Sequence, residues 1–312
     1  MGREGVSMLD DDALQSAEVG ALRSAGDDTL QSADDGTTTD LAVATDWLDH
    51  WRLSLDGAVF QTETSTLAPA YTATGQAVML KISHVEEEQR GSELLAAWSG
   101  HGAARVLEHE GDAVLMERAT GPRSLAHLSV SGADAAATEV LCATAAVLHE
   151  ASADVLDSPG PPDLVPLRTW FRDLFAHADE LTPFHRRGAD LALALLDDER
   201  DVVALHGDVH HANVLDFGER GWLAIDPKGL LGDRTFDYCN LFCNPSPELA
   251  LEPGRLEARF AQVTDAAGFE SHRLARWLMA WCALSSTWHA LDGDDAAAAS
   301  MIRIGERALT LD

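Results

Sequence analysis

Residues 202–237 read VVALHGDVHHANVLDFGERGWLAIDPKGLLGDRTFD, and the fold of the chain is decided around this stretch. An apolar run leads into Asp208, Asn213 follows five residues later, and Asp226 ends the apolar run WLAI. Two short apolar runs flank the glycine-bounded turn 218–221, which predicts a hairpin that folds the chain back. We therefore expect Asp208, Asn213 and Asp226 to meet at one end of a small sheet.

These three side chains are suited to phosphoryl transfer. A carboxylate such as Asp208 can orient and deprotonate an attacking hydroxyl. Asn213 and Asp226 offer oxygen ligands, which Mg²⁺ prefers in proteins. A metal ion held there would bridge the phosphates of a nucleotide and neutralise the charge that develops during transfer.

The motif also resembles a known family. HGDVHHAN is similar to the catalytic loop H-G-D-x-x-x-x-N of kinase-fold small-molecule phosphotransferases. The longer run from His206 to Pro245 resembles the streptomycin 6-phosphotransferase branch of the aminoglycoside kinases, with which hydroxyurea-resistance kinases are grouped. The resemblance covers residues 47 to about 309. It implies an α+β, protein-kinase-like fold of two lobes, with a small β-rich N-lobe and a larger, mostly helical C-lobe.

The resemblance also implies roles for single residues. It makes Asp208 the catalytic base and gives Asn213 and Asp226 to Mg²⁺, with ATP as the phosphoryl donor. His206 is expected to pack beneath the loop and brace it. The alternatives for the three polar residues are a loop carboxylate, a turn asparagine and a strand-end aspartate.

Lysine is scarce, since the 22 basic residues include only Lys81 and Lys228. Lys81 lies in the strand-like run VMLKI, and the family resemblance implies that it contacts the nucleotide phosphates. Its ion-pair partner should be a glutamate of the following helix. Helical spacing favours Glu87, four residues before Gly91, with Glu88 as the second choice.

Lys228 stands two residues after Asp226, in DPKG rather than the DFG of protein kinases. Two interpretations of Lys228 are equally open. It could contact the transferring phosphate or the substrate, or it could pair with Asp233 or Asp237. Asp233 is in turn a candidate for substrate contact, while Asp237 is expected to anchor the catalytic loop.

The adenine site rests on the resemblance alone. It implies backbone hydrogen bonds from the Glu117 carbonyl and the Ala119 amide, with Met116 lining the pocket. The loop expected over the phosphates, QTETST at 61–66, contains no glycine. That departs from the protein-kinase pattern and is typical of aminoglycoside kinases.

The rest of the chain divides into three parts. Residues 1–44 form an acidic segment that we expect to be a disordered tail, 45–120 an N-lobe, and 121–312 a C-lobe. Period-2 and period-3.6 patterns predict strands at 53–60, 66–72, 77–82, 105–110, 113–117, 201–205, 213–217 and 221–225, and helices at 85–98, 133–149, 166–179, 184–198, 236–243, 255–268, 271–291 and 296–309.

The net charge is −30, from 52 acidic and 22 basic residues. Such a charge repels nucleic acid and anionic membrane surfaces, so neither is an expected partner. It attracts cationic small molecules, although solubility or a high-salt habitat would explain it equally well. No apolar run approaches the roughly 20 residues of a membrane span, and we expect a cytoplasmic protein. The residues leave the oligomeric state open.

We therefore predict transfer of the γ-phosphoryl group of ATP, with Mg²⁺, to a hydroxyl of a small molecule. The 6-hydroxyl of streptomycin is the first expectation, and inactivation of the antibiotic would follow from it. Another hydroxylated metabolite or hydroxyurea is the alternative within this class. A non-catalytic nucleotide-binding module and a metallohydrolase built on the His/Cys residues are the alternatives from other classes.

Overall fold

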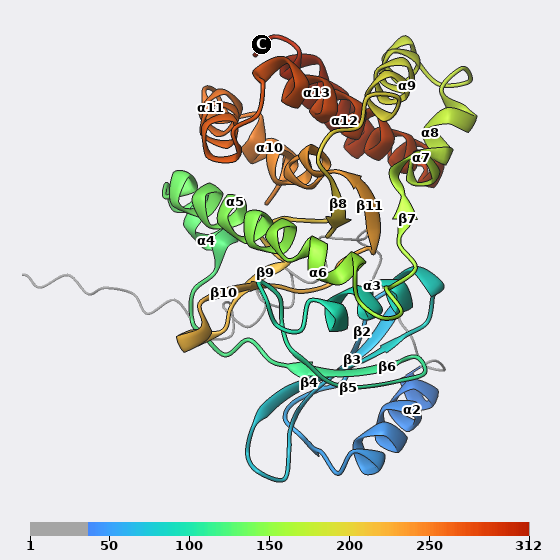
Figure 1. Ribbon diagram of the computed structural model, residues 1–312, viewed down its shortest axis with the longest axis vertical. Coiled ribbons are helices and arrows are strands. Elements are labelled where there is room, and N and C mark those ends of the chain that lie inside the picture. The colour runs from blue at the N-terminus through green and yellow to red at the C-terminus, as the bar shows by residue number, and fades with distance from the viewer. Residues whose placement is uncertain (1–36, 312) are drawn as a thin grey trace, which may run out of the picture.

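The computed structural model describes residues 37–311, with side chains from Ala42 onward. The chain forms two lobes, a sheet-rich N-lobe and a mostly helical C-lobe, which confirms the predicted fold class (Figure 1). Residues 1–36 of the predicted tail lie outside the described residues. The first described helix, α2 (Thr37–His50), begins before the predicted boundary at residue 45.

The N-lobe is built on an antiparallel sheet. Its strands follow the order β1-β3-β4-β6-β5, and β2 also pairs with β3. The bounds are β1 (Ser54–Leu55), β2 (Phe60–Gln61), β3 (Ser65–Tyr71), β4 (Ala77–Ser83), β5 (Val106–Glu110) and β6 (Ala113–Glu117). The predicted strand at 53–60 is thus two short strands, and the other four lie within two residues of their predicted bounds.

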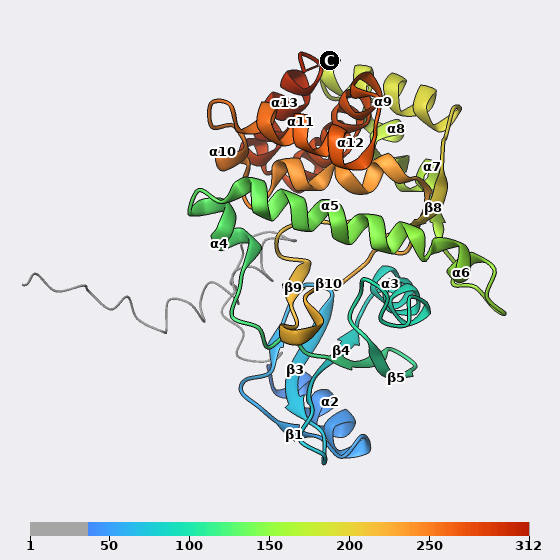
Figure 2. The same ribbon diagram turned by 60° about the vertical axis from the view of Figure 1, so that its left-hand side comes forward.

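Two helices cover the sheet, one on each face (Figure 2). Leu48 of α2 packs in a cluster with Leu80 and Ile82 of β4. Helix α3 (Glu86–Ala97) lies on the opposite face, toward the C-lobe. Because neighbouring strand residues point to opposite faces, Lys81 is directed toward α3 and the space between the lobes.

The longest described helix of the C-lobe is α12 (Ser271–Asp292), in which Trp277 and Trp281 are buried. No helix of the described residues is long and apolar enough to cross a membrane. The other helices are α4 (Leu125–Val130), α5 (Asp134–Glu150), α6 (Ser152–Leu156), α7 (Leu167–Trp170), α8 (Arg172–His177), α9 (Pro183–Leu196), α10 (Pro247–Ala250), α11 (Arg255–Ala267) and α13 (Asp295–Ala308).

Residues 202–237 form short strands in the structure. Strands β9 (Val214–Asp216) and β10 (Trp222–Ala224) form the predicted hairpin. A second sheet has the order β7 (Val165–Pro166), β11 (Leu230–Asp233), β8 (Val202–Leu205), of which β7 and β11 were not predicted. Antiparallel pairing of β8 with β11 ties both ends of segment 206–229 together.

Residues 236–243 were predicted as one helix and form two 3₁₀ turns instead. These are η2 (Arg234–Tyr238) and η3 (Asn240–Cys243). The side chain of Asp233 accepts a hydrogen bond from the Thr235 amide at the start of η2, which fixes a tight turn there.

An ion pair holds the link between the lobes against the β9–β10 hairpin. The Arg123 guanidinium donates to both carboxylate oxygens of Asp216, at 2.7 and 2.8 Å, and lies 4.8 Å from the Trp222 ring centroid. A Cβ atom at Gly121 would lie 2.1 Å from the Asp216 carboxyl carbon. Only glycine therefore fits at Gly121 without displacing this ion pair.

A second glycine sets the distance between the lobes. A Cβ atom on Gly91 of α3 would lie 1.9 Å from the carbonyl oxygen of Pro227, which is backbone and cannot rotate away. The absence of a side chain at Gly91 thus lets α3 approach the segment that carries Asp226.

We predict that Gly91→Ala lowers the free energy of unfolding by about 1–3 kcal/mol, because the added methyl forces α3 away from Pro227. Urea denaturation measures this. Glu93→Ala, at an exposed position of the same helix, should change the value by less than about 0.5 kcal/mol. Equal stability of Gly91→Ala and wild type would contradict the close approach.

Candidate active site

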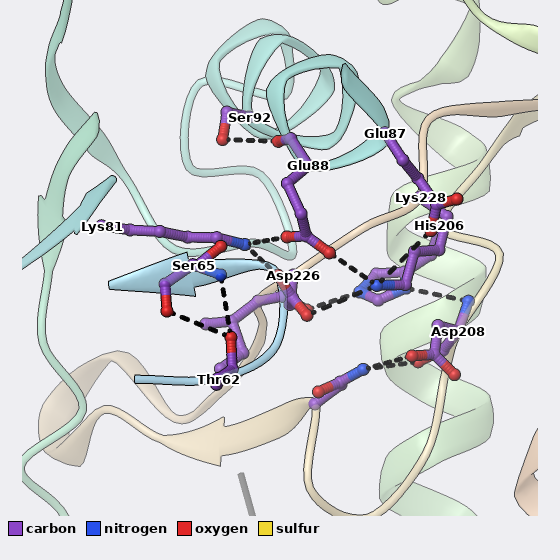
Figure 3. Close-up of polar contacts among 12 residues, drawn as sticks. Thr62, Ser65, Lys81, Glu87, Glu88, Ser92, His206, Asp208, Asp226 and Lys228 are labelled. Atoms are coloured by element: carbon purple, nitrogen blue, oxygen red, sulfur yellow. Dashed lines mark hydrogen bonds and ion pairs between the residues drawn. The ribbon is translucent and has the colours of Figure 1, made fainter. Parts of the chain in front are cut away.

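Four charged side chains meet between the lobes (Figure 3). The Lys81 ammonium contacts the carboxylates of both Glu88 and Asp226. The Lys228 ammonium lies 3.0 Å from Glu88 Oε1 and 3.7 Å from Asp226 Oδ2. Two ammonium groups therefore contact the same two carboxylates. The four side chains come from β4, α3 and the segment after β10.

The partner of Lys81 was predicted wrongly. Glu88, and not Glu87, pairs with it, while Glu87 lies 3.9 Å from Lys228. Helix α3 begins at Glu86, and its buried face includes Glu88, Gly91 and Leu95, spaced by three and four residues. The Glu87 side chain is 36% exposed and the Glu88 side chain 4%.

Lys81 and Asp226 stay ionised despite the burial around them. Burial alone would lower the pKa of Lys81, but the charges of Asp226 and Glu88 raise it above its ordinary value. Burial would likewise raise the pKa of Asp226, and Lys81 and Lys228 hold it well below its usual range. Each charge is stabilised by its neighbours, so removing one leaves the others buried without full compensation.

Asp226 also has an unusual backbone. Its φ of 61° lies in the left-handed region, which aspartate tolerates better than most residues. Gly229, three residues on, has a φ of 67°. These two positions turn the chain out of β10 and back into β11, with the Asp226 side chain directed at Lys81.

Asp208 is held by its own set of donors. Asn213 Nδ2 donates to the Asp208 carbonyl oxygen and to Oδ2, each at 3.0 Å, and Asn240 Nδ2 donates to Oδ1. His210 Nε2 lies 3.6 Å from Oδ2. Burial would raise the pKa of Asp208, but His210 and then Lys228 lower it to about 2. The carboxylate is therefore ionised at neutral pH.

The loop under Asp208 is braced as predicted. His206 is fully buried, its Nε2 lies 2.8 Å from the Ile225 carbonyl oxygen, and its Nδ1 accepts the Asp208 amide at 3.2 Å. Asp237 accepts the backbone amides of His206 and Gly207, at 3.0 and 2.6 Å. Asp237 thus anchors the catalytic loop, as expected.

Asp233 is engaged by groups of the C-lobe itself, which does not favour the expected substrate contact. Its side chain is buried, contacts the Arg273 guanidinium and accepts the Thr235 amide at 2.9 Å. The proposed pairing of Lys228 with Asp233 or Asp237 is also wrong, since Lys228 pairs with Glu88 and Asp226.

The predicted metal ligands fit a hard cation. The side-chain hydrogen bonds of Asn213 use Nδ2, which leaves Oδ1 as an oxygen donor. The Ile225 amide donates to the Asn213 carbonyl oxygen at 2.9 Å. Asp226 is the next residue, so this hydrogen bond keeps the two predicted metal ligands close together. Mg²⁺ accepts one amide oxygen and one carboxylate as ligands when water and phosphate oxygens complete its coordination shell.

Of the residues expected around a nucleotide, some lie beside Lys81 and others at the end of β6 and in the link that follows it. Figure 3 places Thr62 and Ser65 beside Lys81, and the Ser65 amide donates to Thr62 Oγ1 at 3.0 Å. Met116 is buried at the end of β6. The Glu117 side chain is not free, since it accepts the Arg105 amide at 2.6 Å. Ala119 follows in the link between the lobes.

Asn240 is the site residue that the sequence analysis missed. It comes from η3, thirty-two residues after Asp208, in a segment for which no role was predicted. A signal was present, because the whole chain contains only three asparagines: Asn213, Asn240 and Asn244.

Comparisons with known proteins agree with this geometry. The sequence profile of the aminoglycoside/hydroxyurea antibiotic resistance kinases matches residues 50–293. The chain is 48% identical to a streptomycin 3''-kinase of Klebsiella pneumoniae, over 79% of this chain and 92% of that protein. It is 32% identical to a streptomycin 6-kinase of Streptomyces griseus, over 83% and 86%.

Among solved structures, the aminoglycoside phosphotransferase APH(4)-Ia has the same fold, with a TM-score of 0.63 and 16% identity over 88% of this chain and 99% of that one. A thermostable mutant of it was solved as a ternary complex with AMP-PNP and hygromycin B.

We predict that Glu88→Gln lowers the free energy of unfolding by about 3 kcal/mol, because the buried Lys81 and its neighbour Lys228 then share the single carboxylate of Asp226. Glu87→Gln is the matched control and should cost less than about 1 kcal/mol. Chemical denaturation of the two variants separates these values. A larger loss of unfolding free energy in Glu87→Gln than in Glu88→Gln would instead support Glu87 as the partner of Lys81.

Proposed function

The chain belongs to the aminoglycoside/hydroxyurea antibiotic resistance kinase family, and from this premise we propose that it phosphorylates a hydroxyl of streptomycin with ATP. One observation carries the proposal. A half-buried, ionised Asp208, fixed by hydrogen bonds, lies beside the cluster of Lys81, Glu88, Asp226 and Lys228. This arrangement suits a nucleophile on one side and a chain of phosphates on the other.

Each residue has a distinct task in this proposal. Asp208 accepts a hydrogen bond from the acceptor hydroxyl, aims its oxygen at the γ-phosphorus and takes up the proton. Lys81, held by Glu88, orients the α- and β-phosphates. Magnesium held by Asn213 and Asp226 would supply positive charge against the phosphate oxygens.

Lys228 is proposed to contact the transferring phosphate. Its ammonium lies 3.7 Å from Asp226 and also acts electrostatically on Asp208. It therefore stands between the proposed metal ligand and the proposed base, where the γ-phosphate must pass. A lysine is a compact point charge that suits this position.

The two lobes divide the substrates in this proposal. The N-lobe, through Lys81 and the link at Met116, Glu117 and Ala119, holds the nucleotide. The C-lobe holds the acceptor. Streptomycin is cationic, and a chain of net charge −30 attracts it over long distances.

In this proposal, the choice of the modified hydroxyl rests on the relatives. The 48% identity to the 3''-kinase exceeds the 32% identity to the 6-kinase, and this favours the 3''-hydroxyl. The run from His206 to Pro245 resembles the 6-phosphotransferase branch, so the 6-hydroxyl is the alternative.

We predict that Asp208→Asn reduces kcat for streptomycin by roughly 10³- to 10⁴-fold, because the acceptor hydroxyl loses its base. The KM for ATP should stay within about threefold of wild type. Coupled ADP release with Mg²⁺ measures both. Asp190→Asn, at an exposed position of α9, is the control and should retain wild-type kcat.

Binding of ATP without turnover on streptomycin, other aminoglycosides or hydroxyurea would favour a non-catalytic nucleotide-binding module. Wild-type activity in Asp208→Asn would remove Asp208 from the reaction.

We predict that the product of streptomycin and ATP carries its phosphate on the 3''-oxygen. Two-dimensional ¹H–³¹P correlation of the purified product assigns the position directly. A correlation to the proton on carbon 6 would instead support the alternative hydroxyl, and correlations to both would show that the site accepts two orientations.

A further inference from the structure

All three asparagines of this 312-residue chain lie in one series of hydrogen bonds. Asn213 donates to Asp208 Oδ2 at 3.0 Å, Asn240 donates to Oδ1, and Asn244 Nδ2 donates to Asn240 Oδ1 at 2.9 Å. A composition that otherwise avoids asparagine retains it only around one carboxylate. The proposed function already gives Asn213 a role but not the other two.

The two direct donors hold different oxygens of Asp208. Asn213 approaches from the catalytic loop, and Asn240 approaches from η3, which is far away in sequence. A carboxylate held at both oxygens cannot rotate about its Cβ–Cγ bond without losing a hydrogen bond. Each oxygen has two acceptor positions, so one donor on each still leaves room for a substrate hydroxyl.

Asn244 determines which way the Asn240 amide faces. It donates to Asn240 Oδ1 at 2.9 Å and to the Asn240 carbonyl at 3.1 Å. Because Oδ1 is the acceptor there, Nδ2 must face Asp208 as a donor. The reverse orientation would set two oxygens against each other.

The series ends at a buried arginine. The Arg259 guanidinium of α11 donates to the carbonyl oxygens of Asn244 at 2.6 Å and Leu241 at 3.0 Å, and it pairs with Asp134 of α5 at 2.6 Å. Arg259 is only 1% exposed. The backbone that carries Asn240 and Asn244 is therefore fixed to two helices of the C-lobe.

We propose that Asn240 is a positioning residue for the base Asp208, and that Asn244 acts on the reaction only through Asn240. This rests on the proposed function, in which Asp208 accepts the hydroxyl proton. No hydrogen bond of Asn240 or Asn244 reaches Lys81 or Asp226 within the described chain. Their removal should therefore disturb the chemical step and spare nucleotide binding.

Steady-state kinetics with ATP, Mg²⁺ and streptomycin tests the proposal. Asn240→Ala should lower kcat roughly 10- to 100-fold, with both KM values within about threefold of wild type. Asn240→Asp keeps the shape but replaces the donor with a charged acceptor, and it should lower kcat at least as far. Asn240→Ala with wild-type kcat, or with a loss confined to KM for ATP, would overturn the proposal.

A double-mutant cycle tests the place of Asn244. Asn244→Ala should lower kcat by less than Asn240→Ala, and the double variant should match Asn240→Ala alone. Full additivity of the two losses would show that Asn244 acts by a separate route.

NMR spectroscopy tests the hydrogen bond between Asn240 and Asp208 without requiring turnover. Labelling with ¹⁵N-asparagine gives only three side-chain amide signals, because the chain has three asparagines. Asp208→Ala should shift the Asn213 and Asn240 signals, and Asn244→Ala should shift that of Asn240. Asp190→Asn adds a fourth side-chain amide signal, which serves as a control. This signal should not shift when Asp208→Ala is introduced into the same chain.

The two measurements separate the two proposals. An Asn240 signal that does not respond to Asp208→Ala overturns the contact, whatever the activity. No turnover in wild type, together with the expected shifts, overturns the proposed function and leaves the contact established. Thermal melting of each variant identifies a loss of kcat that comes from unfolding.

Discussion

The buried cluster of Lys81, Glu88, Asp226 and Lys228 is the constraint on which the arrangement of the two lobes depends. Charges buried between lobes are tolerated only when each is paired, and here two ammonium groups meet two carboxylates. The pairing brings a strand and a helix of the N-lobe onto a loop of the C-lobe. It also explains Gly91, since any side chain there would push the helix off the loop that carries Asp226.

The second half of the site is stabilised differently, by hydrogen bonds to backbone. Asp237 accepts hydrogen bonds from the amides of the catalytic loop, and Arg259 donates to the carbonyl oxygens of Leu241 in η3 and of Asn244 just after it. Because both anchors are buried, the loop that carries Asp208 belongs to the rigid part of the C-lobe. The proposed nucleotide side of the site thus depends on ion pairs across the lobes, and the proposed acceptor side on a fixed frame within one lobe.

This division bears on specificity. The groups proposed for phosphoryl transfer come from two short parts of the chain, 81–88 and 206–240. In the proposed function, the helical lobe around them holds the acceptor. Relatives that are named for different hydroxyls of streptomycin can therefore share one phosphoryl-transfer site, and the position of the product phosphate reports on the helical lobe.

The sequence by itself determined the two-lobed fold, most strands and helices, the β9–β10 hairpin and the meeting of Asp208 with Asn213. These depend on local periodicity, turn chemistry and short separations along the chain. Tertiary structure alone decided that Glu88 faces Lys81, because adjacent helix positions differ by about 100° and the direction of the partner sets which one is used. It also placed Lys228 on Glu88, Asp233 on Arg273 and Asn240 on Asp208. Each of these joins residues 32 to 140 positions apart, and such pairs are set by how the lobes and helices pack rather than by any pattern along the sequence.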